Sequence, residues 1–360
     1  MSNNTKTRES GIELLRIMTA MAVVMLHYNN GTARGFESVA AGSPQQYILF
    51  LLESMSICAV DLFVMISGFF LSGTQKRTLR KPFELLFQVT FYHEVFYLLS
   101  NILSHKAITL GGLAGNLLPN SYFIILYCAL YLISPFINVT LKKLDSRQWK
   151  ILMIVMICVF SLWNTLVDLG EEIIGMEIVG ISTISQKGSL RGFNIMNFCL
   201  AYVIGAYLRY GKIPACLEKK RNLGLAWIGT VLLIFLWGIG TEKLVLLELR
   251  SAWVYHNPLV LLSAALLIQF FRQIRFSSKI INRIACASFT CFLIHDWVLL
   301  LMDIQKAVNS SVLLMLGHIA FSLTVCYMIA IAAYECYNLV IARLLRKLNW
   351  RIFNPWSIDI

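Results

Sequence analysis

Charged residues are scarce in this chain: they make up 14% of its 360 residues, against roughly 25% in soluble domains. Hydrophobic residues make up 58%, and the mean hydropathy is +0.69. This balance excludes an ordinary soluble enzyme and predicts a polytopic membrane protein. The net charge of +12 does not indicate a nucleic-acid partner, because the positive residues gather in alternate loops, as membrane topology demands.

Several familiar chemical motifs are also missing. None of the nine cysteines forms a Cys-x-x-Cys pair, and nearly all lie within apolar runs. We therefore expect small buried hydrophobes, with neither disulfides nor a metal site. The chain has no Gly-rich phosphate loop, internal repeat or appended soluble domain. No permanently bound cofactor is expected, and any chemistry must take place within or at the edge of the membrane bundle.

What the chain has in abundance is apolar runs long enough to span a membrane. The sequence predicts an all-α bundle of about ten transmembrane helices that forms a single domain over residues 1–360. The predicted helices lie at about 12–30, 48–72, 83–103, 120–140, 151–168, 193–210, 223–241, 256–272, 284–303 and 312–338. Glu9, Glu13 and Arg16 interrupt the start of the first run, and no convincing cleavage site follows it. We expect an uncleaved first helix rather than a signal peptide.

The basic residues predict the topology. All but seven of the 31 lie near the N-terminus, in the tail or in one alternating set of loops. The opposite loops carry acidic residues such as Glu171, Glu172 and Glu177. The positive-inside rule then places both tails, about 1–11 and 341–360, in the cytoplasm of a multi-pass cell-membrane protein. The longest opposite loop, about 169–192, is too short to be an enzyme domain by itself.

Arg16 and His27 are the first candidates for function. They lie eleven residues apart in the first span, which is about three helical turns, so both side chains point off one face. The rise per residue puts them about 16 Å apart, with Arg16 near the cytoplasmic surface and His27 toward mid-bilayer. Ionisable groups at that depth usually face a protein interior or a water-filled path.

Other polar residues fall at a similar predicted depth: Asp61 in the second span, His93 and Glu94 in the third, and His295 and Asp296 in the ninth. The functional interpretation is a polar cavity in which a proton is moved or a thioester is attacked. The structural interpretation is a set of interhelical hydrogen bonds. Asp61 then serves as a helix cap or as the partner of a buried arginine, and Asp296 orients His295 or begins the outer interface.

A basic run follows Ser67-Gly68-Phe69 and holds Lys76, Arg77, Arg80 and Lys81. Its simplest interpretation is topological charge, just as Arg16 could be a snorkelling anchor. The alternative is a cytoplasmic site for the phosphates of a large anionic donor, since the planar guanidinium binds phosphate through two hydrogen bonds.

Taken together, these segments resemble the type 3 family of integral membrane acyltransferases. The first helix, from Arg16 to His27, is similar to that family's Arg-x10-His signature. The helix that ends in Ser67-Gly68-Phe69 before a basic loop is similar to the family's helix that ends in Ser-Gly-Phe. Further matches follow in the expected order: Tyr122 to Pro135, Tyr202-Val-Ile-Gly205-Ala-Tyr, and Ser288-Phe-Thr-Cys-Phe-Leu-Ile-His295. Each match is weak alone, but the ordered set covers residues 12 to about 340.

This resemblance implies transfer of an acyl group, usually acetyl, from cytoplasmic acetyl-CoA to a hydroxyl of a glycan, lipid-linked glycan or similar acceptor. The resemblance also implies catalytic roles for Arg16, His27 and His295, and contacts with the donor for Arg16, Ser67, Gly68 and Arg80. Arg77 and Lys81 join the predicted donor site through the basic run. The third helix, with His93-Glu94, departs from the general family pattern. The chain also lacks the esterase-like domain of some members, so a second transfer is absent or needs an envelope-biosynthesis partner.

A mechanism follows as a hypothesis. His27 acts as general base on the acceptor hydroxyl, or itself accepts the acyl group, while Asp61 or Glu94 orients the imidazole. Two other classes stay open: a transporter or flippase for a small polar or lipid-linked molecule, and a non-catalytic membrane module that senses a ligand.

Overall fold

The structure is a computed structural model that describes residues 9–31, 33–117, 121–175, 180, 190–211, 213–244 and 251–347. These residues form helices and no β-strand, so the predicted all-α class is confirmed for the described part of the chain. Most of the predicted tails 1–11 and 341–360, and of the loop 169–192, lies outside the described residues.

The helices follow one another with short connections. The α-helices are α1 (Ser10–Asn29), α2 (Gly35–Ser38), α3 (Pro44–Ser56), α4 (Ala59–Leu71), α5 (Arg80–Leu103), α6 (Leu110–Leu117), α7 (Tyr122–Lys143), α8 (Ser146–Met156), α9 (Trp163–Ile174), α10 (Ile195–Tyr210), α11 (Lys220–Leu244), α12 (Pro258–Arg272), α13 (Lys279–Ile284), α14 (Ser288–Leu299), α15 (Ile304–Val308) and α16 (Val312–Lys347). A π-helical turn, η1 (Ile157–Leu162), joins α8 to α9. The 3₁₀ turns are η2 (Leu190–Gly192), η3 (Ala215–Leu217), η4 (Ser251–Trp253) and η5 (Ala285–Ala287).

Helices occur at all ten predicted positions, but not all of them are long and apolar enough to cross a membrane. Within the described residues, seven segments meet that condition: Ser10–Asn29, Pro44–Leu71, Leu110–Lys143, Ser146–Ile174, Lys220–Glu242, Ser251–Arg272 and Val312–Ile341. The three predicted spans outside this set coincide with α5, which carries several polar side chains, and with α10 and α14, which have only 16 and 12 residues. The multi-pass character is therefore supported, whereas the number ten and the cytoplasmic termini stay predictions.

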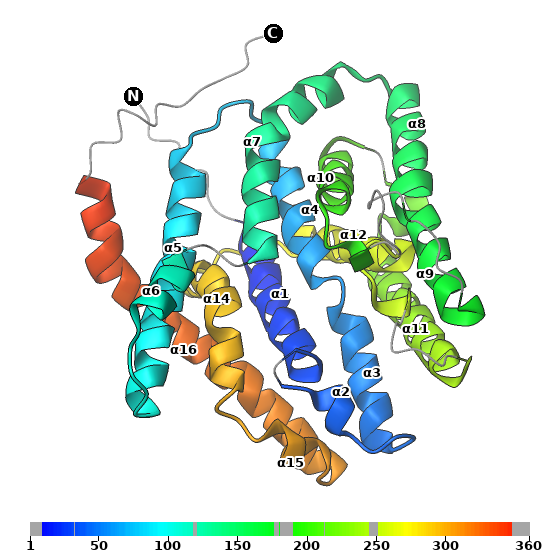
Figure 1. Ribbon diagram of the computed structural model, residues 1–360. Coiled ribbons are helices and arrows are strands. Elements are labelled where there is room, and N and C mark those ends of the chain that lie inside the picture. The colour runs from blue at the N-terminus through cyan, green and yellow to red at the C-terminus, as the bar shows by residue number, and fades with distance from the viewer. Residues whose placement is uncertain are drawn as a thin grey trace.

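Helix α1 runs through the middle of the bundle, with α3 and α4 on one side and α14 on the other (Figure 1). Its apolar residues point in every direction, and a helix that is hydrophobic all round is buried. Side chains hold both of its ends. At the start, the Ser10 hydroxyl donates to Asn282 Oδ1 at 2.9 Å. At the far end, Asn29 and Asn30 donate amide hydrogens to Glu53 of α3, at 2.8 and 3.0 Å.

The span predicted at 48–72 is interrupted, because α3 ends at Ser56 and α4 begins at Ala59. Helix α4 packs closely on α10 through two glycines. A Cβ on Gly68 would collide with the carbonyl oxygen of Tyr202, and one on Gly205 would collide with that of Met65. The glycine of the Ser67-Gly68-Phe69 motif therefore serves this close helix contact, as small residues do in membrane bundles.

Candidate active site

His27 and Asp296 meet where the last turn of α1 packs against α14. His27 Nδ1 lies 2.8 Å from Asp296 Oδ1. Because an ionised carboxylate only accepts hydrogen bonds, the imidazole donates from Nδ1, and the lone pair of the neutral ring is then on Nε2. The two side chains are 38% and 42% exposed, so a substrate can reach them. This is the arrangement of a general base whose tautomer is held by an acid.

His295 adds a second imidazole to the pair. Its ring stands nearly perpendicular to that of His27, at 87°, with the ring centroids 4.4 Å apart. Its Nδ1 lies 3.1 Å from the Cys291 carbonyl oxygen, which only accepts, so Nδ1 donates and Nε2 keeps its lone pair. That Nε2 is buried, has no hydrogen-bond partner within the described part of the chain, and lies 3.8 Å from Asp296 Oδ1. The cluster therefore presents two basic nitrogens around one carboxylate.

The same three residues are the group within the described ranges whose ligand atoms could hold a metal ion, since those atoms lie within 4.8 Å of one another. The 2.8 Å between His27 and Asp296 is a hydrogen-bond distance, shorter than the roughly 3.3 Å expected between two ligands of a tetrahedral zinc ion. The pair is thus arranged for proton transfer. The expectation that the chain holds no resident metal stays a prediction.

Arg16 lines a partly polar cavity of about 420 Å³ between α1, α4, α5, α7, α14 and α16, together with Ser67 and Lys81. Three of the residues predicted to bind the donor thus share one cavity. The Arg16 guanidinium donates to the Glu13 carboxylate at 3.2 Å and remains 34% exposed. Ser67 bonds to the hydroxyl of Tyr127, 3.1 Å away, and Tyr127 also lines the cavity. Positive charge and hydroxyl groups suit the phosphates and amides of a large anionic donor.

One aromatic residue connects this cavity with the histidine cluster. Phe292 lines the cavity and precedes His295 by three residues on α14, so the two side chains lie on neighbouring faces. The Phe292 ring centroid is 6.1 Å from that of His295 and 5.0 Å from that of Phe123. Phe292 therefore lies between the polar cavity, which it lines, and His295, the neighbour of the His27–Asp296 pair.

The structure places Arg77 and Arg80 away from this cavity lining. Arg77 is only 2% exposed and donates to Ser134 Oγ at 2.9 Å and to the carbonyls of Leu71, Thr74 and Lys76. These bonds occupy most of its donors, so its guanidinium closes the turn between α4 and α5. Arg80 pairs with Glu84 at 2.7 Å. Of the predicted basic run, Lys81 is the member that lines the cavity.

Neither Asp61 nor Glu94, the acids expected beside His27, forms a hydrogen bond to it. Asp61 is buried in the first turn of α4 and accepts a hydrogen bond from the Asn197 amide of α10 at 2.8 Å. Glu94 lies on α5, with Oε2 buried and without a hydrogen-bond partner among the described residues. Their catalytic roles stay predictions, and the acid in contact with His27 is Asp296.

Asp296 is the residue whose role the sequence did not predict. The sequence places it in the set of polar residues at membrane depth, with orienting His295 or beginning the outer interface as its structural interpretation, because adjacent residues on a helix diverge by about 100° and nothing in the spacing pairs Asp296 with His27. At that angle both side chains can still face one neighbouring helix. The signal that could have found the pairing is the presence of two adjacent ionisable residues in an otherwise apolar helix, Ser288–Leu299, which predicts that the partner helix also carries a polar residue.

Comparison with known proteins gives one family. The model of an acyltransferase domain, acyltransferase family 3, matches residues 9–332. No curated protein and no solved structure matches the chain. The matched range contains every candidate residue described above and most of the chain, so the predicted resemblance is confirmed. With its apolar helices, the chain belongs to acyltransferase family 3 and is a multi-pass membrane acyltransferase.

Proposed function

We propose that the protein transfers an acyl group, in the first place acetyl, from cytoplasmic acyl-CoA to a hydroxyl of a cell-envelope glycan or lipid-linked glycan. The hydrogen bond between His27 and Asp296 carries the proposal, because it leaves a basic Nε2 at a site that a substrate can reach. The Arg16 cavity supports it from the other end of α1.

The proposed reaction needs no group beyond donor and acceptor. His27 Nε2 takes the proton of the acceptor hydroxyl while the hydroxyl oxygen attacks the carbonyl carbon of the thioester. The tetrahedral intermediate collapses, the carbon–sulfur bond breaks, and the imidazolium returns its proton to the departing CoA thiolate. Asp296 stabilises the imidazolium in between. If His27 Nε2 instead attacks the thioester, the carbon–sulfur bond breaks and CoA leaves as the thiolate. The acceptor oxygen then attacks the acyl-imidazolium, the carbon–nitrogen bond breaks to restore the imidazole, and the hydroxyl proton passes to the CoA thiolate.

Donor binding is assigned to the cavity of Arg16, Ser67 and Lys81. Arg16 and His27 are eleven residues apart on α1, which is about 16 Å along the axis. The phosphates would bind at the basic end, and the pantetheine arm would extend along α1 past Phe292 toward the histidines. The acceptor would arrive from the far side, with other envelope-biosynthesis proteins supplying it.

The test uses membranes from a strain that lacks the gene, complemented with the wild-type chain or with His27→Ala, and supplied with radiolabelled acetyl-CoA. Label appearing in lipid-linked or polymeric glycan only with the wild-type chain supports acyl transfer. Glycan labelling by the His27→Ala variant at the wild-type rate would contradict the assignment of the base. Uptake of a substrate into proteoliposomes that does not depend on acetyl-CoA would instead favour the transporter alternative.

A further inference from the structure

A second cavity, of about 500 Å³, lies against the other face of α1. Its lining on α1 includes Leu15, Met18, Ala22 and Met25. At 100° per residue these side chains point roughly opposite to the face shared by Arg16 and His27. Residues of α3, α4, α11, α12 and α16 form the rest of its walls, and it shares no lining residue with the cavity of Arg16, Ser67 and Lys81.

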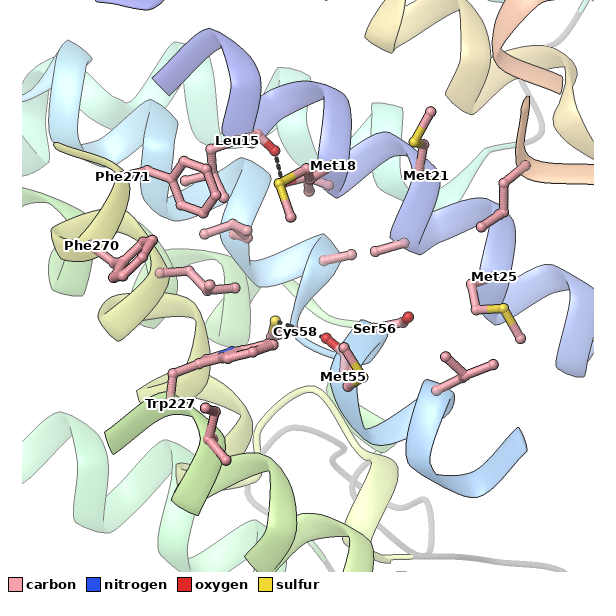
Figure 2. A pocket seen from close by; sticks show the side chains of 18 of the residues that line it. Leu15, Met18, Met21, Met25, Met55, Ser56, Cys58, Trp227, Phe270 and Phe271 are labelled. Carbon is pink, nitrogen blue, oxygen red and sulfur yellow. Dashed lines mark hydrogen bonds between the residues drawn. The ribbon is translucent and has the colours of Figure 1, made fainter. Parts of the chain in front are cut away.

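The lining is almost entirely apolar, and methionines are prominent in it. Figure 2 shows Met18, Met21, Met25 and Met55 around the open space, with Phe270, Phe271 and Trp227 toward one end. Thr19, one of the few polar residues in the lining, donates its hydroxyl hydrogen to the Leu15 carbonyl of its own helix at 2.7 Å. A cavity with such walls does not hold ordered water, and flexible methionine side chains adapt well to hydrocarbon.

The length of the cavity along α1 suits part of one hydrocarbon chain. From Leu15 to Met25 the lining follows α1 for ten residues, about 15 Å. That is half of the roughly 30 Å hydrocarbon core of a bilayer, the depth of a single leaflet.

Two groups at one end of the cavity point to a polar head on that chain. The Trp227 indole is part of the lining (Figure 2), and its Nε1 is buried without a hydrogen-bond partner in the described ranges. About two turns earlier on α11, Lys220 Nζ lies 5.1 Å from the ring centroid of Phe270, which also lines the cavity. An N–H donor suits an ester carbonyl, and an ammonium group suits a phosphate.

We propose that this cavity binds one acyl chain of a glycerophospholipid from the leaflet at the Lys220 end of α11. The phosphate lies at Lys220, an ester carbonyl accepts the Trp227 Nε1–H, and the chain runs among the methionines toward Met25. The lipid is a structural ligand that packs against α1 on the face opposite Arg16 and His27. The proposal does not depend on the chemistry proposed for His27.

Two glycines of α11 provide a matched pair of variants. Gly224 lines the cavity, and a Cβ there would approach Phe270 Cε2 at 3.4 Å, an ordinary contact distance. Gly229 lies on the same helix, and a Cβ there would meet nothing within 4 Å. Gly224→Leu would obstruct the cavity and Gly229→Leu would not, while both replacements gain the same helix propensity. Apparent melting temperatures identify any variant that fails to fold.

The purified full-length chain is incubated in mixed micelles with phosphatidylglycerol that carries a diazirine near the end of one acyl chain, then irradiated, digested and analysed by mass spectrometry. We expect cross-links at residues 18–25 and 52–62 in the wild-type chain and in Gly229→Leu, reduced about tenfold in Gly224→Leu. Lys220→Gln and Trp227→Phe should each reduce them about threefold to fivefold, whereas Lys219→Gln should not.

Cross-links spread evenly over the lipid-facing helices, and equal in both glycine variants, would overturn the proposal by showing only annular lipid. A diazirine-bearing polyprenyl phosphate that labels the same residues more strongly than phosphatidylglycerol would also overturn it, since the occupant would then be an isoprenoid chain.

Discussion

The two faces of α1 differ as sharply as any two regions of this molecule. One face carries Arg16 and His27 and borders a cavity with charged and hydroxyl-bearing walls. The other face borders a cavity of similar volume lined almost wholly by apolar side chains. Both cavities border the same helix. A rotation of α1 about its own axis would move Arg16 and His27 into the apolar cavity, so the fold must prevent that rotation. The bonds of Ser10 at its start and of Asn29 and Asn30 at its end provide that restraint.

This contrast predicts that changes on the polar face affect turnover, while changes on the apolar face affect stability and lipid binding. The largest effect short of removing the base itself is expected from Asp296→Asn. The asparagine amide can donate to His27 Nδ1, which favours the tautomer with its proton on Nε2 and so removes the base. We expect acetyl transfer in membrane vesicles to fall by about 10²- to 10⁴-fold.

The matched control is Asp303→Asn. Asp303 caps α15 by accepting from the Lys306 backbone N–H at 3.2 Å, and its replacement should leave the transfer rate nearly unchanged. An Asp296→Asn variant that retains full transfer activity would remove Asp296 from the catalytic assignment.

A smaller effect is expected at the donor end. Arg16→Gln removes the positive charge from the cavity, and a hydrogen bond to a charged group contributes about 1.5–3 kcal/mol. The KM for acetyl-CoA should therefore rise about 10- to 100-fold while kcat changes less. Arg34→Gln, which removes an exposed arginine paired with Glu37, serves as control and should not alter KM. An unchanged KM in Arg16→Gln would make Arg16 an anchor, as the alternative interpretation holds.

The contact of α4 with α10 allows a test of stability alone. Gly68→Ala introduces a Cβ that would collide with the Tyr202 carbonyl oxygen, and such overpacking costs about 1–3 kcal/mol. We expect a lower apparent melting temperature in detergent, with Gly229→Ala unchanged or slightly higher. Reduced activity of Gly68→Ala at unaltered stability would indicate instead that Gly68 contacts the donor.

The smallest effect is expected on the apolar face. Met21→Leu conserves volume in the apolar cavity and should cost less than about 1.5 kcal/mol, with the transfer rate unchanged. Thermal unfolding and the vesicle assay check both parts. A loss of activity comparable to that of Arg16→Gln would break the division of α1 into two faces.

Much of this arrangement could be predicted from the sequence, because it depends on periodicity and hydropathy along single helices. The positions of the helices and the shared face of Arg16 and His27 follow from local spacing. The pairing of acid and base does not, since it depends on which helices become neighbours. Depth alone points to Asp61 or Glu94 as the acid that orients His27, yet depth says nothing of the direction around the bundle, and the acid hydrogen-bonded to His27 is Asp296. Arg77 likewise fits a phosphate-binding pattern, but its hydrogen-bond partners are Ser134 Oγ of α7 and the carbonyl groups of Leu71, Thr74 and Lys76.

The central claim is that His27 is the base of an acyl transfer. Its most direct test is the initial rate of label transfer from radiolabelled acetyl-CoA to envelope glycan in vesicles that hold equal amounts of folded wild-type chain or His27→Ala, with His105→Asn as a surface control. We expect His27→Ala to lose transfer by about 10²- to 10⁴-fold while His105→Asn retains it. Transfer by His27→Ala at the rate of the wild-type chain would contradict the account.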